Sequence, residues 1–331
     1  MGAQSTRRAV LRRGVRFLSG LTAPLWLSCQ ALGQDRFPSK PIHLIVPWPS
    51  GGSSDAVMRA FAESASNVLS VPVVVENRPG ASGTLGAAAM VSAKPDGYTL
   101  TQLPLGVYRL PHMQKTPYDA VRDVTHIVGL AGYTFGLVTG LELPFKTLKE
   151  MVAYAKAHPG TLEYGSTGIG TTPHLAMEEF CQKAGISLNH VPYKGTAELL
   201  QAVLAGHIRM MCGSTEFTPY VKEGRLRLLA TLGKKRSKWF ADVPTIQEAG
   251  WDTISESPYG IGGPRGMDPA IVKILHDAFR KTLDDPKVLD MLDRYAQPVI
   301  YMNTEEYGHY AQHTFEAERM TIERLGLAKK G

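Results

Sequence analysis

The chain has 331 residues, which is long enough for two domains of ordinary size. Hydrophobic residues make up 44% of it and aromatic residues 8%, which is typical of a globular protein and excludes extended disorder. The first 33 residues carry five arginines and no acid, so about +1 of the formal charge of +6 belongs to the remainder. A nucleic-acid partner is therefore not expected.

Residues 1–33 predict a cleavable export signal peptide. The arginines precede a short apolar run that ends in small residues before Gln34. A membrane anchor needs a longer uninterrupted run, and Pro24 interrupts this one. The Arg7–Arg8 pair resembles a twin-arginine signal, so both that route and the Sec route stay open.

From Pro38 onward, short β-type runs alternate with helix-type runs, which favours an α/β fold with parallel sheets. In the first part we predict strands at 42–48, 71–76 and 98–103, and helices at 56–69 and 84–93. The middle part repeats the pattern, with strands at 161–164, 187–191, 208–212 and 226–231, and helices from Thr147, at 173–183 and at 197–205. From Pro269 the chain is predicted to be mainly helical.

Two extended segments, 125–139 and 253–264, separate these units and predict two lobes with a ligand cleft between them. We expect lobe 1 to comprise residues 34–132 and 257–331, and lobe 2 to comprise residues 133–256.

Loops rich in glycine, serine and threonine follow several predicted strands. Ligands of open α/β sheets bind at the carboxyl ends of strands, where backbone N–H groups and helix N-termini favour an anion. A single loop of this kind is as readily a turn or a cap, but several at strand ends indicate a shared site. The candidate ligand contacts in these loops are Ser50, Gly51, Gly52, Ser53, Ser54, Asp55, Gly80, Ser82, Ser166, Thr167, Gly168, Gly170, Thr171, Thr172, Gly213 and Ser214.

Two further candidates each have two interpretations. Asp55 either caps the helix that begins beside it or contacts a ligand that carries a hydroxyl or amino group. His174 either donates to an anion or holds its own loop in shape.

Common enzyme motifs do not occur. The chain has no G-x-S-x-G elbow and no Walker motif, and Pro173 prevents the glycine run 165–170 from forming a dinucleotide fingerprint. His309 and His313 have a spacing that suits a metal, but an exposed helix face is the simpler interpretation. We therefore expect no metal, no cofactor and no catalytic residue. A secreted hydrolase that uses Ser53 or Ser166 with His174 is the enzymatic alternative.

A set of motifs in order resembles a known family. The chain reads VPWPSGGSSD, VVVENRPGASGTLGA, KPDGYTL, HPGTLEYGSTGIGTTPHL, HVPYKG and DVPTIQEAG between about residue 37 and residue 250. Together these motifs resemble the extracytoplasmic solute receptors of tripartite tricarboxylate transporters, often called Bug receptors.

The resemblance implies a periplasmic, type II-like binding protein whose two α/β lobes close on a small organic carboxylate. Such receptors deliver the ligand to the membrane components of the transporter. The first loop, which matches Trp48 and residues 49–55, grips one carboxylate, and the second loop, which matches 166–172, meets it from the other lobe. A receptor that reports the ligand to a sensor protein is the alternative.

The chain departs from the family pattern after the strand that ends in Cys212. Many members resembling this one have an aromatic-Asp-Asn run where this chain has Cys212, Gly213 and Ser214. No acid stands there to hold an ammonium group, so we expect a dicarboxylic, tricarboxylic or aromatic ligand. Whether Cys181 and Cys212 form a disulfide stays open.

Overall fold

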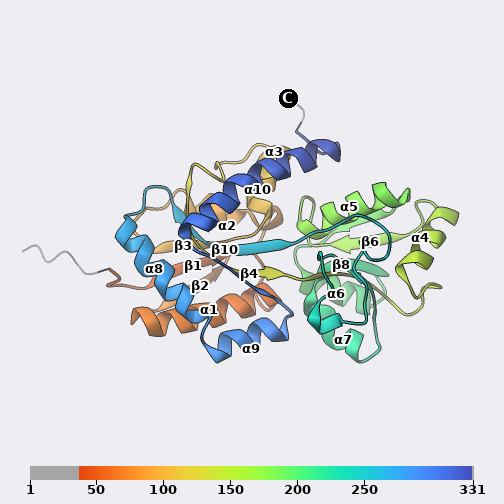
Figure 1. The fold of residues 1–331 in the computed structure, drawn as a ribbon, viewed down its shortest axis with the longest axis horizontal. Helices are drawn as coiled ribbons and strands as arrows, with labels where there is room; N and C mark the ends of the chain where they lie inside the picture. Colours follow the sequence, from red (N-terminus) through yellow and green to blue (C-terminus); the bar gives the residue numbers. More distant parts are fainter. Residues whose placement is uncertain (1–36, 330–331) are drawn as a thin grey trace, which may run out of the picture. The chain divides into compact units, whose positions relative to one another are not determined.

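The computed structural model describes residues 37–329, so the predicted signal peptide lies outside the described residues. Within this range the chain forms two mixed β-sheets flanked by helices (Figure 1). The first sheet has the order β11-β4-β10-β3-β1-β2. Its strands are β1 (Ile42–Val46), β2 (Val73–Asn77), β3 (Thr99–Leu103), β4 (Val124–Tyr133), β10 (Ser257–Pro264) and β11 (Val299–Met302).

The second sheet has the order β7-β6-β8-β5-β9. Its strands are β5 (Phe135–Thr139), β6 (Glu163–Ser166), β7 (Asn189–Pro192), β8 (Met210–Ser214) and β9 (Arg227–Thr231). In each sheet three adjacent strands pair in parallel, β2-β1-β3 in the first and β7-β6-β8 in the second. The strand contributed from the far side of a crossover, β10 or β5, pairs antiparallel with the strand on either side of it. Apart from β11 at the edge of the first sheet, the two halves therefore share one topology. The predicted two-lobed α/β fold is confirmed, but the prediction of parallel sheets is wrong, because both sheets are mixed.

The chain passes between the sheets twice. Thr134 alone separates β4 from β5, and residues 232–256 lead from β9 back to β10. The predicted lobe boundaries at 132/133 and 256/257 stay a prediction, because the chain from Phe37 onward packs as one compact unit.

Amphipathic helices cover the first sheet. Three residues of the predicted apolar stripe of α1 (Ser53–Leu69), namely Val57, Phe61 and Ala65, are fully buried, but Val68 is 39% exposed. The other helices around this sheet are α2 (Leu85–Met90), α3 (Gly106–Met113), α8 (Pro269–Thr282), α9 (Pro286–Arg294) and α10 (Thr304–Arg324). The second sheet is covered by α4 (Leu148–Ala157), α5 (Thr172–Ala184), α6 (Thr196–Leu204) and α7 (Thr218–Lys222).

Three elements were not predicted from the sequence. Helix α3 contains Pro111 and begins with Gly106, both poor helix formers, and α7 and β11 are very short. The burial of Val107, Tyr108 and Leu110 against the rest of the lobe stabilises α3 in spite of its composition. Helix propensity is a local property of the sequence, so it could not predict a helix that is stabilised by this packing.

The structure also describes the two cysteines, the histidine pair near the C-terminus and the length of the helices. Cys181 and Cys212 are both buried free thiols. His309 and His313 are exposed side chains of α10, which agrees with the interpretation that they lie on an exposed helix face. Among the helices of residues 37–329, none is both long and apolar enough to cross a membrane.

Candidate functional site

Loops at the carboxyl ends of strands from both sheets enclose a cavity of about 330 Å³. The first sheet contributes the loops after β1, β2 and β3, and the second sheet contributes those after β6, β7 and β8. This is the expected position for a ligand of open α/β sheets. Half of the predicted contacts line the cavity: Trp48, Gly52, Ser53, Ser54, Ser82, Thr167, Thr171, Thr172 and Ser214.

The loop before α1 is held by the Asp55 carboxylate. One of its oxygens accepts from the Gly51 N–H at 2.9 Å, and the other accepts from Asn77 at 2.8 Å and lies 3.0 Å from Nε of Arg59. Burial acts to raise the pKa of Asp55, but hydrogen bonds from Arg59, Gly51 and Asn77 outweigh it and hold the pKa below its ordinary value. Asp55 is thus an ionised residue that shapes the loop from outside the cavity lining.

Ser53, the first residue of α1, lines the cavity, and its two hydrogen-bonding groups differ in their partners. Its N–H donates to Oε1 of Glu216 at 2.9 Å, across the cavity from the second sheet. Its hydroxyl is buried and has no hydrogen-bond partner among the described residues. Buried hydroxyls without partners are uncommon in folded proteins, and one that lines a cavity indicates a place for a bound group.

Ser54 and Tyr133 connect the helix start to the crossover between the sheets. The Ser54 and Tyr133 hydroxyls are 2.8 Å apart, and Gln102 donates to the Tyr133 hydroxyl, also at 2.8 Å. Tyr133 ends β4 next to Thr134, so the crossover backbone is tied to the cavity wall.

The loop between β6 and α5 is ordered by its own polar groups. Nδ1 of His174 accepts from the Gly170 N–H at 3.2 Å, and Oγ1 of Thr171 donates to the Gly168 carbonyl at 2.7 Å. Gly168 has a φ of +124°, a conformation that favours glycine. His174 lies outside the cavity lining, and its geometry matches the interpretation in which it shapes the loop.

The hydrolase alternative finds no support in this loop. The Ser166 hydroxyl lies 2.7 Å from Nε2 of His190, and the residue is fully buried. Burial lowers the pKa of His174 to about 3, and nearby His190 and Arg109 act in the same direction. Among the described residues, neither Ser53 nor Ser166 hydrogen-bonds to His174.

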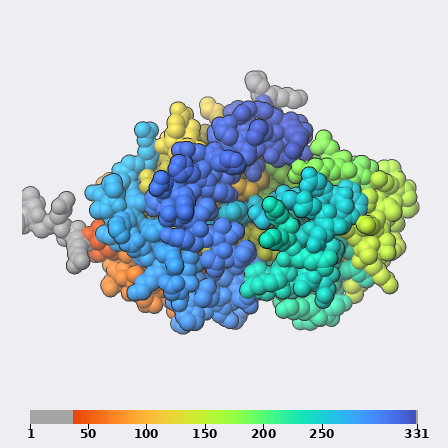
Figure 2. Space-filling view, in the orientation of Figure 1, coloured from red at the N-terminus to blue at the C-terminus, as the bar shows by residue number. Residues whose placement is uncertain are grey.

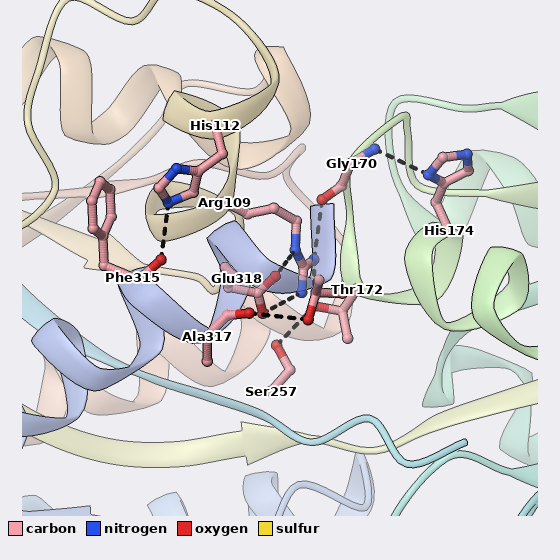
Figure 3. A network of polar contacts seen from close by, with 10 residues as sticks. Arg109, His112, Gly170, Thr172, His174, Ser257, Phe315, Ala317 and Glu318 are labelled. Carbon is pink, nitrogen blue, oxygen red and sulfur yellow. Dashed lines mark hydrogen bonds and ion pairs between the residues drawn. The ribbon is translucent and has the colours of Figure 1, made fainter. Parts of the chain in front are cut away.

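Hydrogen bonds join the loops of the two sheets beside the cavity. Ser82 donates to the Ile169 carbonyl at 2.5 Å. Arg109 of α3 is paired with Glu318 of α10 at 2.6 and 2.8 Å, and it also donates to the Gly170 carbonyl at 3.1 Å (Figure 3).

Further hydrogen bonds connect the two halves near this ion pair and at the surface. Oγ1 of Thr172 lies 3.4 Å from Arg109 and 3.3 Å from the hydroxyl of Ser257 at the start of β10. At the surface, Arg324 of α10 donates to Glu179 of α5 at 2.8 Å, where the C-terminal helix in dark blue adjoins the green residues of the second half (Figure 2). The structure therefore shows the two halves in contact around the cavity.

The other predicted contacts support the loops from outside the cavity lining: Ser50, Gly51, Asp55, Gly80, Ser166, Gly168, Gly170, His174 and Gly213. Most of the lining residues that sequence reasoning overlooked are apolar or charged, because it searched for small polar loops. Gly106, Gly195, Thr196 and Ser257 are small residues outside the loops that were selected. The carboxyl ends of the predicted strands could have pointed to some of them. The overlooked residues are Pro49, Pro79, Pro104, Leu105, Gly106, Tyr133, Phe135, Lys194, Gly195, Thr196, Ala197, Glu198, Glu216 and Ser257.

Comparisons with known proteins agree with this architecture. The family model described as "Tripartite tricarboxylate transporter family receptor" matches residues 57–327. A relative from Cupriavidus necator, the "UPF0065 protein in gbd 5'region", is 45% identical over 323 residues, which cover 98% of each chain.

Solved structures show the same fold. The periplasmic binding protein BugD is 27% identical, with a TM-score of 0.84 over 89% of this chain and 100% of that chain. A protein of R. palustris solved with adipate has a TM-score of 0.82 at 26% identity, over 88% of this chain and 99% of that chain. The protein MatC of Rhodopseudomonas palustris, solved with bound malate, has a TM-score of 0.81 at 26% identity, over 86% and 100%.

Proposed function

Because the chain belongs to the family of tripartite tricarboxylate transporter receptors, we propose that it captures a small organic carboxylate in the periplasm. It then delivers this ligand to the membrane components of a tripartite tricarboxylate-type transporter. The candidate ligands are dicarboxylates, tricarboxylates and aromatic carboxylates. Members of this family are solute-binding receptors, and the match favours delivery to a transporter over the sensor alternative.

One observation carries the carboxylate assignment. Ser53 lines the cavity, and its hydroxyl is buried without a hydrogen-bond partner among the described residues. It is the first residue of α1, a helix of 17 residues whose N-cap, Gly52, supplies no side-chain cap. The partial positive charge of this helix end favours an anion, and a hydroxyl is a suitable donor to a carboxylate. The two similar structures solved with adipate and malate support the same ligand class.

The way the site is divided supports closure of the two lobes on the ligand. The cavity takes lining residues from both halves, and within residues 37–329 two chain segments connect these halves. A ligand that contacts both halves gains those contacts only in the closed form, so it shifts the population toward that form.

Thermal melting against a panel of anions tests the carboxylate assignment. Adipate, malate, citrate and benzoate are the probes, and glucose and magnesium chloride are the controls. A ligand that binds only the native state at 100 times its Kd stabilises it by about 2.7 kcal/mol, so the midpoint should rise by several degrees. A shift with sugars or cations and none with any carboxylate would contradict the proposal.

Delivery is tested separately in cells. Deletion of the gene should abolish uptake of the radiolabelled carboxylate that gives the largest melting shift, and the wild-type gene should restore uptake. If uptake persists while induction of other genes by that carboxylate is lost, the sensor alternative holds instead.

A further inference from the structure

Glu216 places a carboxylate of the protein itself at the N-terminus of α1. It follows β8 of the second sheet, and its Oε1 accepts from the Ser53 N–H at 2.9 Å. Its Oε2 accepts from the Ser214 hydroxyl at 2.8 Å. Glu216 lines the cavity, so an acid faces the ligand space two residues after Ser214, where the sequence pattern alone had indicated none.

The backbone N–H and the side-chain hydroxyl of Ser53 therefore differ in whether they have a hydrogen-bond partner. The N–H is occupied by Glu216, while the hydroxyl is buried and has no partner among the described residues. A ligand carboxylate can accept from the hydroxyl, and the part of the ligand beside that carboxylate then meets Glu216. Glu216 accepts from the N–H of the same residue whose hydroxyl is free, so the two anchor groups, the Ser53 hydroxyl and the Glu216 carboxylate, lie close together. The corresponding ligand groups must therefore lie on the same or neighbouring carbon atoms.

The charges around the cavity restrict the ligand further. Among the residues that line it, the charged side chains are Lys194, Glu198 and Glu216, one cation and two anions. A second ligand carboxylate next to Glu216 would be repelled, and the repulsion is stronger in a partly enclosed site than in water. A hydroxyl or ammonium group would instead donate to Glu216 in a charge-assisted hydrogen bond.

We propose that Glu216 is a specificity-determining residue that selects a carboxylate with a hydrogen-bond donor on the carbon next to it. It rejects ligands with a second carboxylate at that carbon. The remaining lining includes the aromatic side chains of Trp48, Tyr133 and Phe135, which suit an apolar or aromatic body. This inference rests on the proposed function and narrows its ligand class.

A set of probes that differ at one carbon tests the proposal. Phenylacetate, mandelate, phenylglycine and phenylmalonate carry hydrogen, hydroxyl, ammonium and carboxylate at that position. Propionate, lactate, alanine and methylmalonate repeat the series with a small body, so that size does not decide the result. Calorimetric titration gives each Kd for the wild type, for Glu216→Gln and for Glu223→Gln, a matched control on an exposed residue of the same segment.

The wild type should bind the hydroxyl and ammonium members of at least one series roughly tenfold to a hundredfold more tightly than the member with hydrogen, and the dicarboxylate most weakly. Glu216→Gln should reduce the preference for the ammonium member by about tenfold or more and should strengthen binding of the dicarboxylate. Glu223→Gln should leave the order unchanged. Melting of the unliganded variants confirms that each one is folded.

Three results would overturn the proposal. Equal preferences in the wild type and in Glu216→Gln would show that another group selects the ligand. Tighter binding of every carboxylate by Glu216→Gln would show that the ligand carboxylate displaces Glu216 from the Ser53 N–H. Binding of adipate or citrate without binding of either series would refute the selectivity and leave the carboxylate receptor intact, whereas no binding of any carboxylate would refute the proposed function itself.

Discussion

Ser53 combines a satisfied backbone donor with an unsatisfied side-chain donor at one point of the cavity. Leaving a buried hydroxyl without a partner costs free energy of folding, and such a cost persists where binding requires the group. Its neighbour Ser54 has the opposite character, because its hydroxyl is paired with Tyr133. The two serines are adjacent in sequence, and only their surroundings leave one hydroxyl free and pair the other.

Replacement of Ser53 separates these roles. Ser53→Ala should weaken carboxylate binding by about tenfold to a hundredfold, the value of a hydrogen bond to a charged group. It should leave the free energy of unfolding unchanged or slightly raised, because it removes an unpaired buried hydroxyl. Calorimetric titration and urea unfolding measure the two effects.

Ser54→Ala is the comparison variant and should lower the free energy of unfolding by about 1 kcal/mol. If Ser53→Ala destabilises the unliganded protein as much as Ser54→Ala and binds as tightly as the wild type, the hydroxyl of Ser53 is structural.

At the scale of elements, α3 and α10 hold the loop between β6 and α5 through one ion pair. Arg109 and Glu318 are buried together, with side chains 4% and 12% exposed, and Arg109 also reaches the Gly170 carbonyl. The loop that closes one side of the cavity is therefore anchored to helices of the first half. The C-terminal helix, which the sequence marked only as helical, takes part in holding the two halves together.

Removal of one partner of this pair should be more harmful than removal of both. Arg109→Met leaves the Glu318 carboxylate buried without its partner and should lower the free energy of unfolding by about 3 to 5 kcal/mol. The double variant Arg109→Met/Glu318→Leu should recover part of this loss, because no unpaired buried charge remains. Urea unfolding of the two single variants and the double variant measures the coupling.

Arg319→Met, on an exposed arginine of α10, is the control and should have no measurable effect. Additive effects of the two substitutions at Arg109 and Glu318 would contradict the coupling.

At the scale of the whole molecule, buried histidines set the response to acid. Burial lowers the pKa of His126 to about 4. Burial also lowers the pKa of His174 to about 3, together with the charges of His190 and Arg109. In the unfolded chain a histidine titrates near 6.5, so the unfolded state binds more protons than the folded state below that pH. The folded protein therefore loses stability as the pH falls from about 6.5 toward 4.

Each of these two histidines should lower the free energy of unfolding by about 1 to 2 kcal/mol between pH 6.5 and pH 5. Urea unfolding at pH 7.5, 6.5, 5.5 and 5 measures the slope of the free energy of unfolding against pH. His126→Gln should flatten it, while His309→Gln on the exposed face of α10 should leave it unchanged. An identical slope in His126→Gln and the wild type would show that His126 does not contribute.

The sequence by itself determined the alternation of strands and helices, the two-lobed α/β class and the position of the loops at strand ends. These follow from hydrophobic periodicity and turn chemistry, which are local properties. Helix α3 escaped prediction because its stability comes from burial of Tyr108 and its neighbours, and the bounds of the two lobes stay a prediction.

Only the tertiary structure decided which polar residues face the cavity. Asp55 and His174 are polar groups in the correct loops, yet the structure turns both toward the backbone of those loops. Glu216 is 163 residues from Ser53 in the chain and contacts it across the cavity. Side-chain direction and long-range pairing depend on how the two sheets meet, and no local pattern encodes that meeting.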